Sequence, residues 1–222
     1  MSITENVKKI LSELPPGVLL VAASKTNSSA AVREAISAGV YACGENRVQE
    51  MLQKSEEDAY SGAPLHFIGH LQSNKVRQVV GLCDLIQSVS STELLRRIND
   101  RAALMDITQD LLLEINIAGE LSKSGLSPAN LPEILETAAS LSFIRVRGLM
   151  CIPPISVKTG QNRPYFAAMH DLFIDIGLKK YDNVLMDFLS MGMSGDYLDA
   201  AAEGANLIRV GSAIFGERNY SG

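Results

Sequence analysis

The segment VLLVAASK, residues 18–25, is a nearly continuous apolar run that ends in a lysine. Apolar residues at every position, rather than at alternate positions, are typical of a strand buried on both faces, as in parallel sheets. Two segments with helical features flank this run. Residues 3–14 precede it and stop at a Pro-Pro-Gly turn, and residues 29–38 follow it and stop at Gly39.

Strand and helix patterns alternate along the rest of the chain. Strict alternation indicates a parallel sheet. Eight units close a barrel, whereas five or six units would favour an open doubly wound sheet. The expected strands span residues 18–25, 40–44, 65–69, 85–89, 110–117, 145–152, 187–191 and 207–210. We therefore predict an α/β fold in which residues 1–222 form one (β/α)8 TIM barrel domain with an extra N-terminal helix.

The composition excludes several classes of protein. The chain is 46% hydrophobic and 20% charged with a net charge of −5, and it has no basic stripe that would favour nucleic acid as a partner. It shows no signal peptide and no apolar run of membrane length, so we expect a cytoplasmic protein without membrane association. The spacing of Cys43, Cys83 and Cys151, and of the three histidines, predicts reduced packing cysteines and no metal site.

Lys25 stands where a barrel of this kind builds its ligand site, at the carboxyl end of a strand. Burial of a charged lysine is costly, which should lower the pKa of its amine. A neutral amine is what attack on an aldehyde and formation of a Schiff base require. The alternative is a lysine whose chain extends past the strand end into solvent, which is the common fate of such residues.

Residues 190–196, SMGMSGD, have the composition of an anion-binding loop. The glycines free the backbone to turn its N–H groups towards a ligand, and Ser194 is placed to cap a helix that begins near Asp196. The alternative is a glycine-rich turn without a ligand.

Arg209, Gly211 and Ser212 add further donors after the eighth strand. Loops after strands seven and eight are the usual phosphate site of these barrels, so two donor segments at this place favour a phosphate ligand. For Arg209 the alternative is a salt bridge at the barrel mouth with Glu45 or Glu114.

Polar residues also follow the second and third strands. Asn46 is either a ligand contact or an N-cap of the next helix. His70 and Gln72 either line the mouth or cap the helix that follows them. His66 lies inside the third strand and is more typical of a packed core residue.

Short blocks along the chain together resemble the YggS/PROSC family of pyridoxal 5′-phosphate (PLP) homeostasis proteins. The blocks occur in the family's order and span about residues 18–220. They are VAASKT (21–26), GENRVQE (44–50), HFIGHLQSNK (66–75), SKSG (122–125), RGLM (147–150), LSMGMSGD (189–196) and VGSAIFG (210–216).

The resemblance implies a monomeric barrel similar to the N-terminal domain of bacterial alanine racemase, with PLP as a Schiff base on Lys25. It implies that Ser194, Gly211 and Ser212 bind the phosphate and that Arg209 faces the pyridine nitrogen. The cofactor-binding residues expected in all are Lys25, Asn46, Met191, Gly192, Met193, Ser194, Arg209, Gly211 and Ser212.

The family is implicated in vitamin B6 homeostasis and in amino-acid and keto-acid balance, and the resemblance brings no established catalytic reaction. Many members carry a second lysine two positions after the Schiff-base lysine, where this chain has Asn27. Lys123 keeps its place in its block, and our hypothesis is that it forms a second, transient contact with PLP.

Three functions stay open at this point. An arginine that faces the pyridine nitrogen disfavours protonation of that nitrogen and makes the ring a weaker electron sink. We also expect no second domain to supply the tyrosine base that alanine racemase uses. Both points favour a PLP-binding homeostasis protein that releases the cofactor to apoenzymes or amino acids. The alternatives are a racemase-like PLP enzyme and a barrel enzyme that acts on a phosphorylated sugar or acid.

Overall fold

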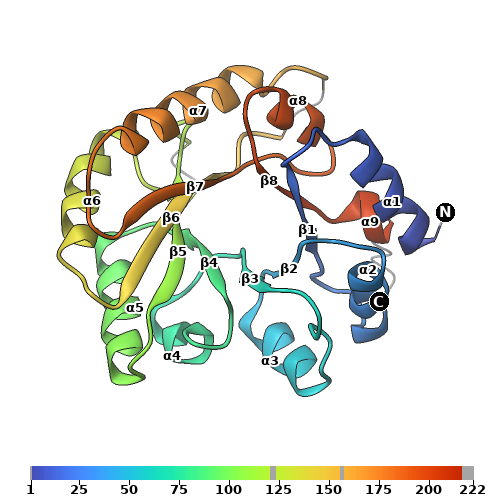
Figure 1. The fold of residues 1–222 in the computed structure, drawn as a ribbon, viewed down its shortest axis with the longest axis horizontal. Helices are drawn as coiled ribbons and strands as arrows, with labels where there is room; N and C mark the ends of the chain where they lie inside the picture. The colour runs from blue at the N-terminus through green and yellow to red at the C-terminus, as the bar shows by residue number, and fades with distance from the viewer. Residues whose placement is uncertain (1, 121–123, 156–157, 217–222) are drawn as a thin grey trace.

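A computed structural model describes residues 2–120, 124–155 and 158–216, and its strands form a closed parallel barrel. Each strand pairs with the next along the chain, and the last strand pairs with the first. Figure 1 shows the strands as a ring with the helices outside it. The strands are β1 Leu19–Ala23, β2 Ala42–Glu45, β3 Leu65–Phe67, β4 Leu85–Val89, β5 Gln109–Ile115, β6 Ile144–Cys151, β7 Val184–Ser190 and β8 Leu207–Val210. The predicted (β/α)8 barrel is confirmed.

Helices separate successive strands, and the predicted N-terminal helix precedes the first. They are α1 Ile3–Glu13, α2 Ser29–Ser37, α3 Val48–Glu56, α4 Val76–Val79, α5 Thr92–Leu104, α6 Leu131–Ala139, α7 Arg163–Gly177, α8 Tyr197–Ala202 and α9 Ser212–Phe215. A capping box between Ser2 and Glu5 begins α1. This helix lies beside α9 (Figure 1), where Asn6 Nδ2 donates to the carbonyl of Ile214 at 2.8 Å. The first and last helices therefore cover the seam at which β1 meets β8.

The apolar residues of the strands divide into two clusters. One inner cluster takes one residue from each of six strands: Val21, Ala42, Leu85, Leu112, Met150 and Leu207. The other cluster joins outward residues such as Leu20 and Ala22 to residues of the surrounding helices, such as Val32. Both faces of a strand are thus apolar, which is the physical reason for the continuous run at residues 18–25.

The seventh strand differs most from its prediction, while the other strands begin and end within two residues of the predicted bounds. The seventh strand begins at Val184, three residues before the predicted start at residue 187. Residues 184–186 (VLM) are apolar, but Asp187 separates them from the apolar residues that follow, and the prediction began at this interruption. The first half of the strand is also only partly buried, with Leu185 43% exposed. Arg147 of β6 forms ion pairs with Asp110 of β5 and with Asp187 of β7.

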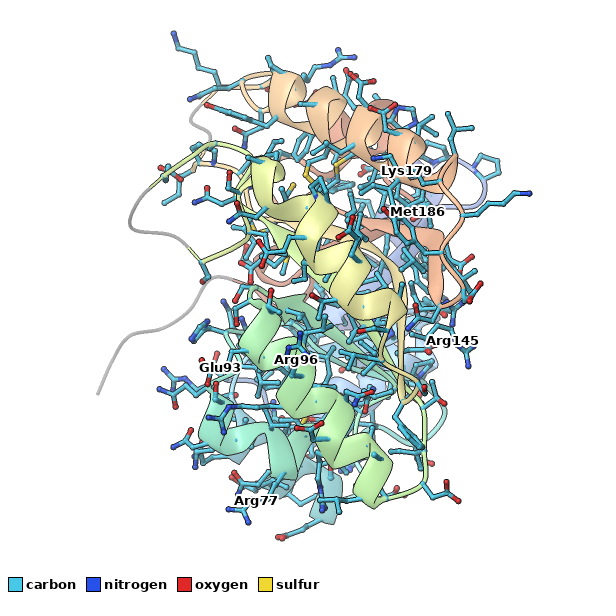
Figure 2. The ribbon with its side chains drawn as sticks, turned by 90° about the vertical axis from the view of Figure 1, so that its left-hand side faces the viewer. Arg77, Glu93, Arg96, Arg145, Lys179 and Met186 are labelled. Atoms are coloured by element: carbon cyan, nitrogen blue, oxygen red, sulfur yellow. The ribbon has the colours of Figure 1, made fainter. Side chains whose placement is uncertain are left out.

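The helices of the barrel wall carry charged side chains on their outer side. Figure 2 shows α5, α6 and α7 side by side along the barrel wall, with charged side chains such as Arg77, Glu93 and Arg96 directed outward. None of the helices in the described part of the chain is long and apolar enough to cross a membrane. All three cysteines are buried and unbridged, as the sequence predicted.

Gly148 is the position where the backbone of the barrel depends most directly on glycine. Its φ is +145°, and a Cβ there would lie 1.9 Å from the carbonyl oxygen of Phe188 on β7. Gly17 also has a positive φ, +88°, but a Cβ there would have no neighbour within 4 Å.

We expect Gly17→Ala to cost about 1 kcal/mol of unfolding free energy, from backbone strain alone. Gly148→Ala should cost about 3 kcal/mol or more, because a steric clash with β7 adds to the strain. Urea unfolding of both variants measures the difference. Equal losses would contradict the close approach of β6 and β7.

Candidate functional site

The pairing of β1 with β8 places the predicted ligand groups side by side. The register pairs Ala22 with Val210, so Lys25 and Ser212 leave adjoining strands at the same end of the barrel. Gly211 makes the approach close, because a Cβ there would lie 3.3 Å from the carbonyl oxygen of Ala23. The closure of the barrel therefore brings the first and last strands of the chain to one site.

Ser194 joins the two predicted donor segments. Its hydroxyl oxygen accepts from the backbone N–H of Gly211 at 3.2 Å and from that of Ala213 at 3.3 Å. The prediction that Ser194 caps the following helix is wrong: the N-cap of α8 is Asp196, with no side-chain cap hydrogen bond. Two backbone amides thus converge on one oxygen atom beside the exposed Ser212, which is the arrangement that a phosphate oxygen requires.

The loop after β7 is fixed by its own hydrogen bonds. Gly192 has a φ of +91°, and a Cβ there would lie 2.6 Å from Cβ of Ala200. The amide of Met191 donates to the carbonyl of Leu207 at 3.1 Å, and the amide of Met193 donates to Asp196 Oδ1 at 2.8 Å. Because these two amides are already engaged, a direct contact of Met191 or Met193 with a ligand stays a prediction.

A chain of hydrogen bonds crosses the barrel interior from Arg209 to His66. Arg209 Nη1 donates to Ser190 Oγ at 2.5 Å, and Nη2 donates to the carbonyl of Cys151 at 2.8 Å. Ser190 Oγ donates to Gln87 Oε1 at 2.7 Å, and Gln87 Nε2 donates to His66 Nδ1 at 2.9 Å. The direction of the whole chain is fixed because a guanidinium can only donate. This Arg209–His66 chain links β8, β7, β4 and β3.

Arg209, Glu45 and Glu114 all lie in the described part of the chain, and Arg209 forms no ion pair within 4.0 Å with either glutamate. The alternative of a salt bridge is therefore wrong. Glu45 pairs instead with Lys54. Burial lowers the pKa of the Arg209 guanidinium. Burial also raises the pKa of Glu114, and the charge of Arg209 opposes that shift in part.

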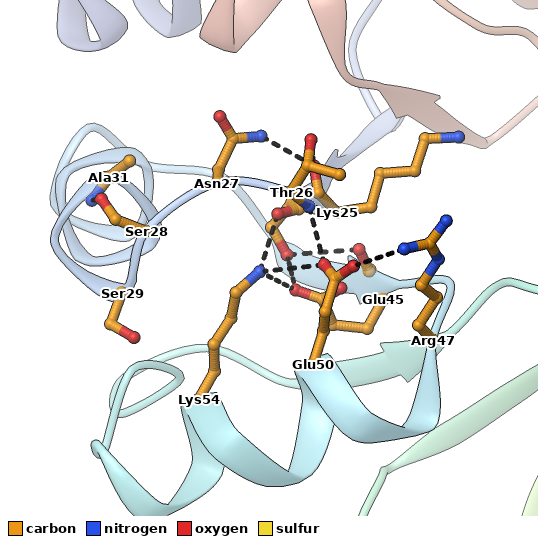
Figure 3. Close-up of polar contacts among 12 residues, drawn as sticks. Lys25, Thr26, Asn27, Ser28, Ser29, Ala31, Glu45, Arg47, Glu50 and Lys54 are labelled. Atoms are coloured by element: carbon orange, nitrogen blue, oxygen red, sulfur yellow. Dashed lines mark hydrogen bonds and ion pairs between the residues drawn. The ribbon is translucent and has the colours of Figure 1, made fainter. Parts of the chain in front are cut away.

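Lys25 is half-buried at the mouth. Figure 3 shows its side chain extending away from Lys54 and Glu50. The carbonyl oxygen of Lys25 accepts from Asn27 Nδ2 at 3.0 Å, so Asn27 braces the backbone of Lys25. Lys123 lies outside the described residues.

Asn46 does not cap α3, because the N-cap of that helix is Arg47, which makes no side-chain cap hydrogen bond. Within the described residues, Asn46 Oδ1 is a buried atom without a hydrogen-bond partner. An acceptor at the mouth is therefore available to a ligand. His66 is only 2% exposed, which confirms the prediction of a core residue.

Ala213 and Gln87 were not expected at the site, and Ser190, expected in the anion-binding loop, bonds to Arg209 and Gln87 inside the barrel. Ala213 contributes only a backbone amide, which no side-chain pattern reveals. Gln87 and Ser190 did carry a signal, because a polar residue within a strand that is buried on both faces needs a buried partner.

The chain is similar to known proteins over nearly its whole length. The model of the family "alanine racemase, N-terminal domain" matches residues 1–219. A pyridoxal phosphate homeostasis protein of Aquifex aeolicus is 42% identical over 90% of this chain and 87% of its own. The PipY structure of Synechococcus elongatus with PLP bound has a TM-score of 0.88 at 36% identity, covering 97% of this chain and 100% of that chain. An alanine racemase of Clostridium difficile has a TM-score of 0.78 at 13% identity, covering 99% of this chain and 60% of that chain, which shows a shared fold.

The Arg209–His66 chain predicts a pH dependence of stability. Nδ1 of His66 accepts a hydrogen bond, and burial lowers the pKa of His66 from 6.5 to about 4. The unfolded chain binds this proton near pH 6.5 and the folded chain only near pH 4. The stability that neutral His66 contributes is therefore present above pH 6.5 and is lost as the pH falls to 4, by up to about 3 kcal/mol.

Urea unfolding between pH 7.5 and 4.5 measures this loss. We expect His66→Gln to flatten the dependence, whereas the control His70→Gln, at an exposed histidine, keeps it. An unchanged pH dependence in His66→Gln would show that His66 does not titrate in this way.

Proposed function

The chain belongs to the family of pyridoxal phosphate homeostasis proteins and to the alanine racemase N-terminal domain family, and we propose that it binds PLP and serves PLP homeostasis and amino-acid and keto-acid balance. The observation that carries this proposal is the register of β1 with β8, which sets Lys25 beside the amides that converge on Ser194. The PLP-bound PipY structure, which is similar over nearly the whole chain, supports it.

The chemistry of the residues at the mouth fits PLP. PLP supplies an aldehyde that combines with primary amines, and Lys25 offers such an amine at the carboxyl end of β1. We propose that Lys25 holds PLP as a Schiff base. Ser194, Gly211 and Ser212, with the amide of Ala213, would bind the phosphate, since backbone and hydroxyl donors suit that dianion.

Arg209 is proposed to face the pyridine nitrogen. Its bonds to Ser190 and Cys151 hold the guanidinium in place, and arginine stays charged in proteins. A fixed cation disfavours a proton on a nitrogen that it faces. Asn46 offers its unpaired acceptor at the same mouth.

This arrangement favours a protein that holds and releases the cofactor over a racemase. The similarity to alanine racemase is at the level of the fold, and it gives no support for racemase activity. We propose that the recipients are PLP-dependent apoenzymes or amino acids. The monomeric state, the cytoplasmic location and the single-domain organisation expected from the sequence are part of the same proposal.

The variant Lys25→Ala tests whether Lys25 holds PLP as a Schiff base. We expect the protein with added PLP to show a visible absorption band that borohydride removes, leaving the cofactor mass on the peptide that contains Lys25. The variant should lack both signals because it lacks the amine. Lys8→Ala, at an exposed lysine of α1, is the matched control. A Lys25→Ala protein that keeps the band would disprove the assignment.

The double variant Ser194→Ala/Ser212→Ala tests the phosphate site. Hydrogen bonds to a charged group are worth about 1.5–3 kcal/mol, so we expect the Kd for PLP to rise at least about tenfold. Pyridoxal lacks the phosphate, and its affinity should stay unchanged. The control is Ser12→Ala, on the exposed side of α1. Equal weakening for both ligands would remove the two serines from the phosphate site.

A further inference from the structure

A buried polar cluster lies on the outer side of the barrel wall, directly behind the end of β1. Glu45 Oε1 accepts three hydrogen bonds: from Lys54 Nζ at 2.6 Å, Ser24 Oγ at 2.6 Å and Tyr60 Oη at 3.2 Å. The side chain of Lys54 is 8% exposed and that of Glu45 is 0% exposed. Charges removed from water in this way are tolerated only when they are paired and hydrogen-bonded.

Two side chains of α3 reach from this cluster to the backbone on either side of Lys25. Lys54 Nζ donates to the carbonyl oxygen of Ser24 at 2.8 Å. Glu50 Oε2 accepts from the amide of Thr26 at 2.7 Å and lies 3.8 Å from Lys54 Nζ. Figure 3 shows these contacts gathered below the segment that carries Lys25. The backbone of Lys25 is therefore held before and after the residue by one helix.

The backbone at Thr26 needs such support. Its φ is +65°, a left-handed conformation that β-branched residues adopt rarely and at a cost. The bond from its amide to Glu50 stabilises this conformation from outside the turn. Without it, residues 24–26 would relax, and the direction in which the Lys25 side chain leaves the strand would change.

We propose that Glu50 and Lys54 are positioning residues for Lys25. They hold the turn that aims the amine into the barrel mouth, and they touch neither the ligand nor the reacting atoms. This inference rests on the proposed function of Lys25. Because both contacts are to the backbone, while the Lys25 side chain points away from them (Figure 3), they act through its orientation.

The experiment compares Glu50→Ala, which removes the acceptor for the Thr26 amide, with Glu50→Gln, which keeps an acceptor oxygen. Glu56→Ala, at an exposed residue at the end of the same helix, is the matched control. A small displacement of a reacting group can cost up to about 100-fold in rate, so we expect Glu50→Ala to form the visible band with PLP about tenfold more slowly. Glu50→Gln should restore most of the rate.

Hydrogen exchange of the Thr26 amide, measured without PLP, gives a second readout. It should be faster in Glu50→Ala than in Glu56→Ala, because only Glu50 accepts a hydrogen bond from this amide. Lys54→Met should slow band formation, as Glu50→Ala does. Lys54→Met alone leaves the Glu45 carboxylate buried without its cation. The double variant Glu45→Gln/Lys54→Met is therefore measured beside it, because it removes both charges.

Band formation at the wild-type rate in Glu50→Ala, with unchanged Thr26 exchange, would overturn the positioning role. A wild-type protein that forms no borohydride-sensitive band on Lys25 would instead overturn the proposed function. The two failures are therefore distinguishable.

Discussion

The pairing of β1 with β8 is the constraint on which the rest of the structure depends. Four residue pairs, from Leu19 with Leu207 to Ala22 with Val210, turn an open sheet into a barrel. The same pairs bring Lys25, near the start of the chain, to the same end of the barrel as Gly211 and Ala213, whose amides converge on Ser194. The contact of α1 with α9 covers this seam. The pairing of β1 with β8 thus both closes the barrel and assembles the site.

Much of the fold could be predicted from the sequence because parallel strands in a barrel are buried on both faces. Val21 faces the inner cluster while Leu20 and Ala22 face the helices, so the strand appears as an unbroken apolar run. The prediction lost accuracy where a charged residue interrupts the apolar run of a strand, as at Asp187 of β7, which follows the apolar residues 184–186. The pattern of apolar residues indicates which positions are buried. It indicates where a strand ends only if burial and strand pairing end at the same residue.

The residues of the site could be predicted from the sequence better than the contacts between them. The sequence placed Lys25, Ser194 and Gly211 at strand ends, but it offered capping of α8 for Ser194 and a salt bridge for Arg209. Which side chains share a layer inside the barrel depends on register, and register shifts interrupt three of the strand pairs. The support of Lys25 by Glu50 and Lys54 depends on contacts to backbone atoms. Such contacts cannot be predicted from the spacing of residue types.

The central claim is that one amine at the end of β1 and one set of donors at the ends of β7 and β8 hold the same molecule of PLP. A crystal structure of the protein grown with PLP tests it most directly. We expect continuous electron density from Nζ of Lys25 to the aldehyde carbon, with the phosphate against Ser194, Gly211 and Ser212. Density that joins PLP to another lysine, or a phosphate bound away from these residues, would contradict it.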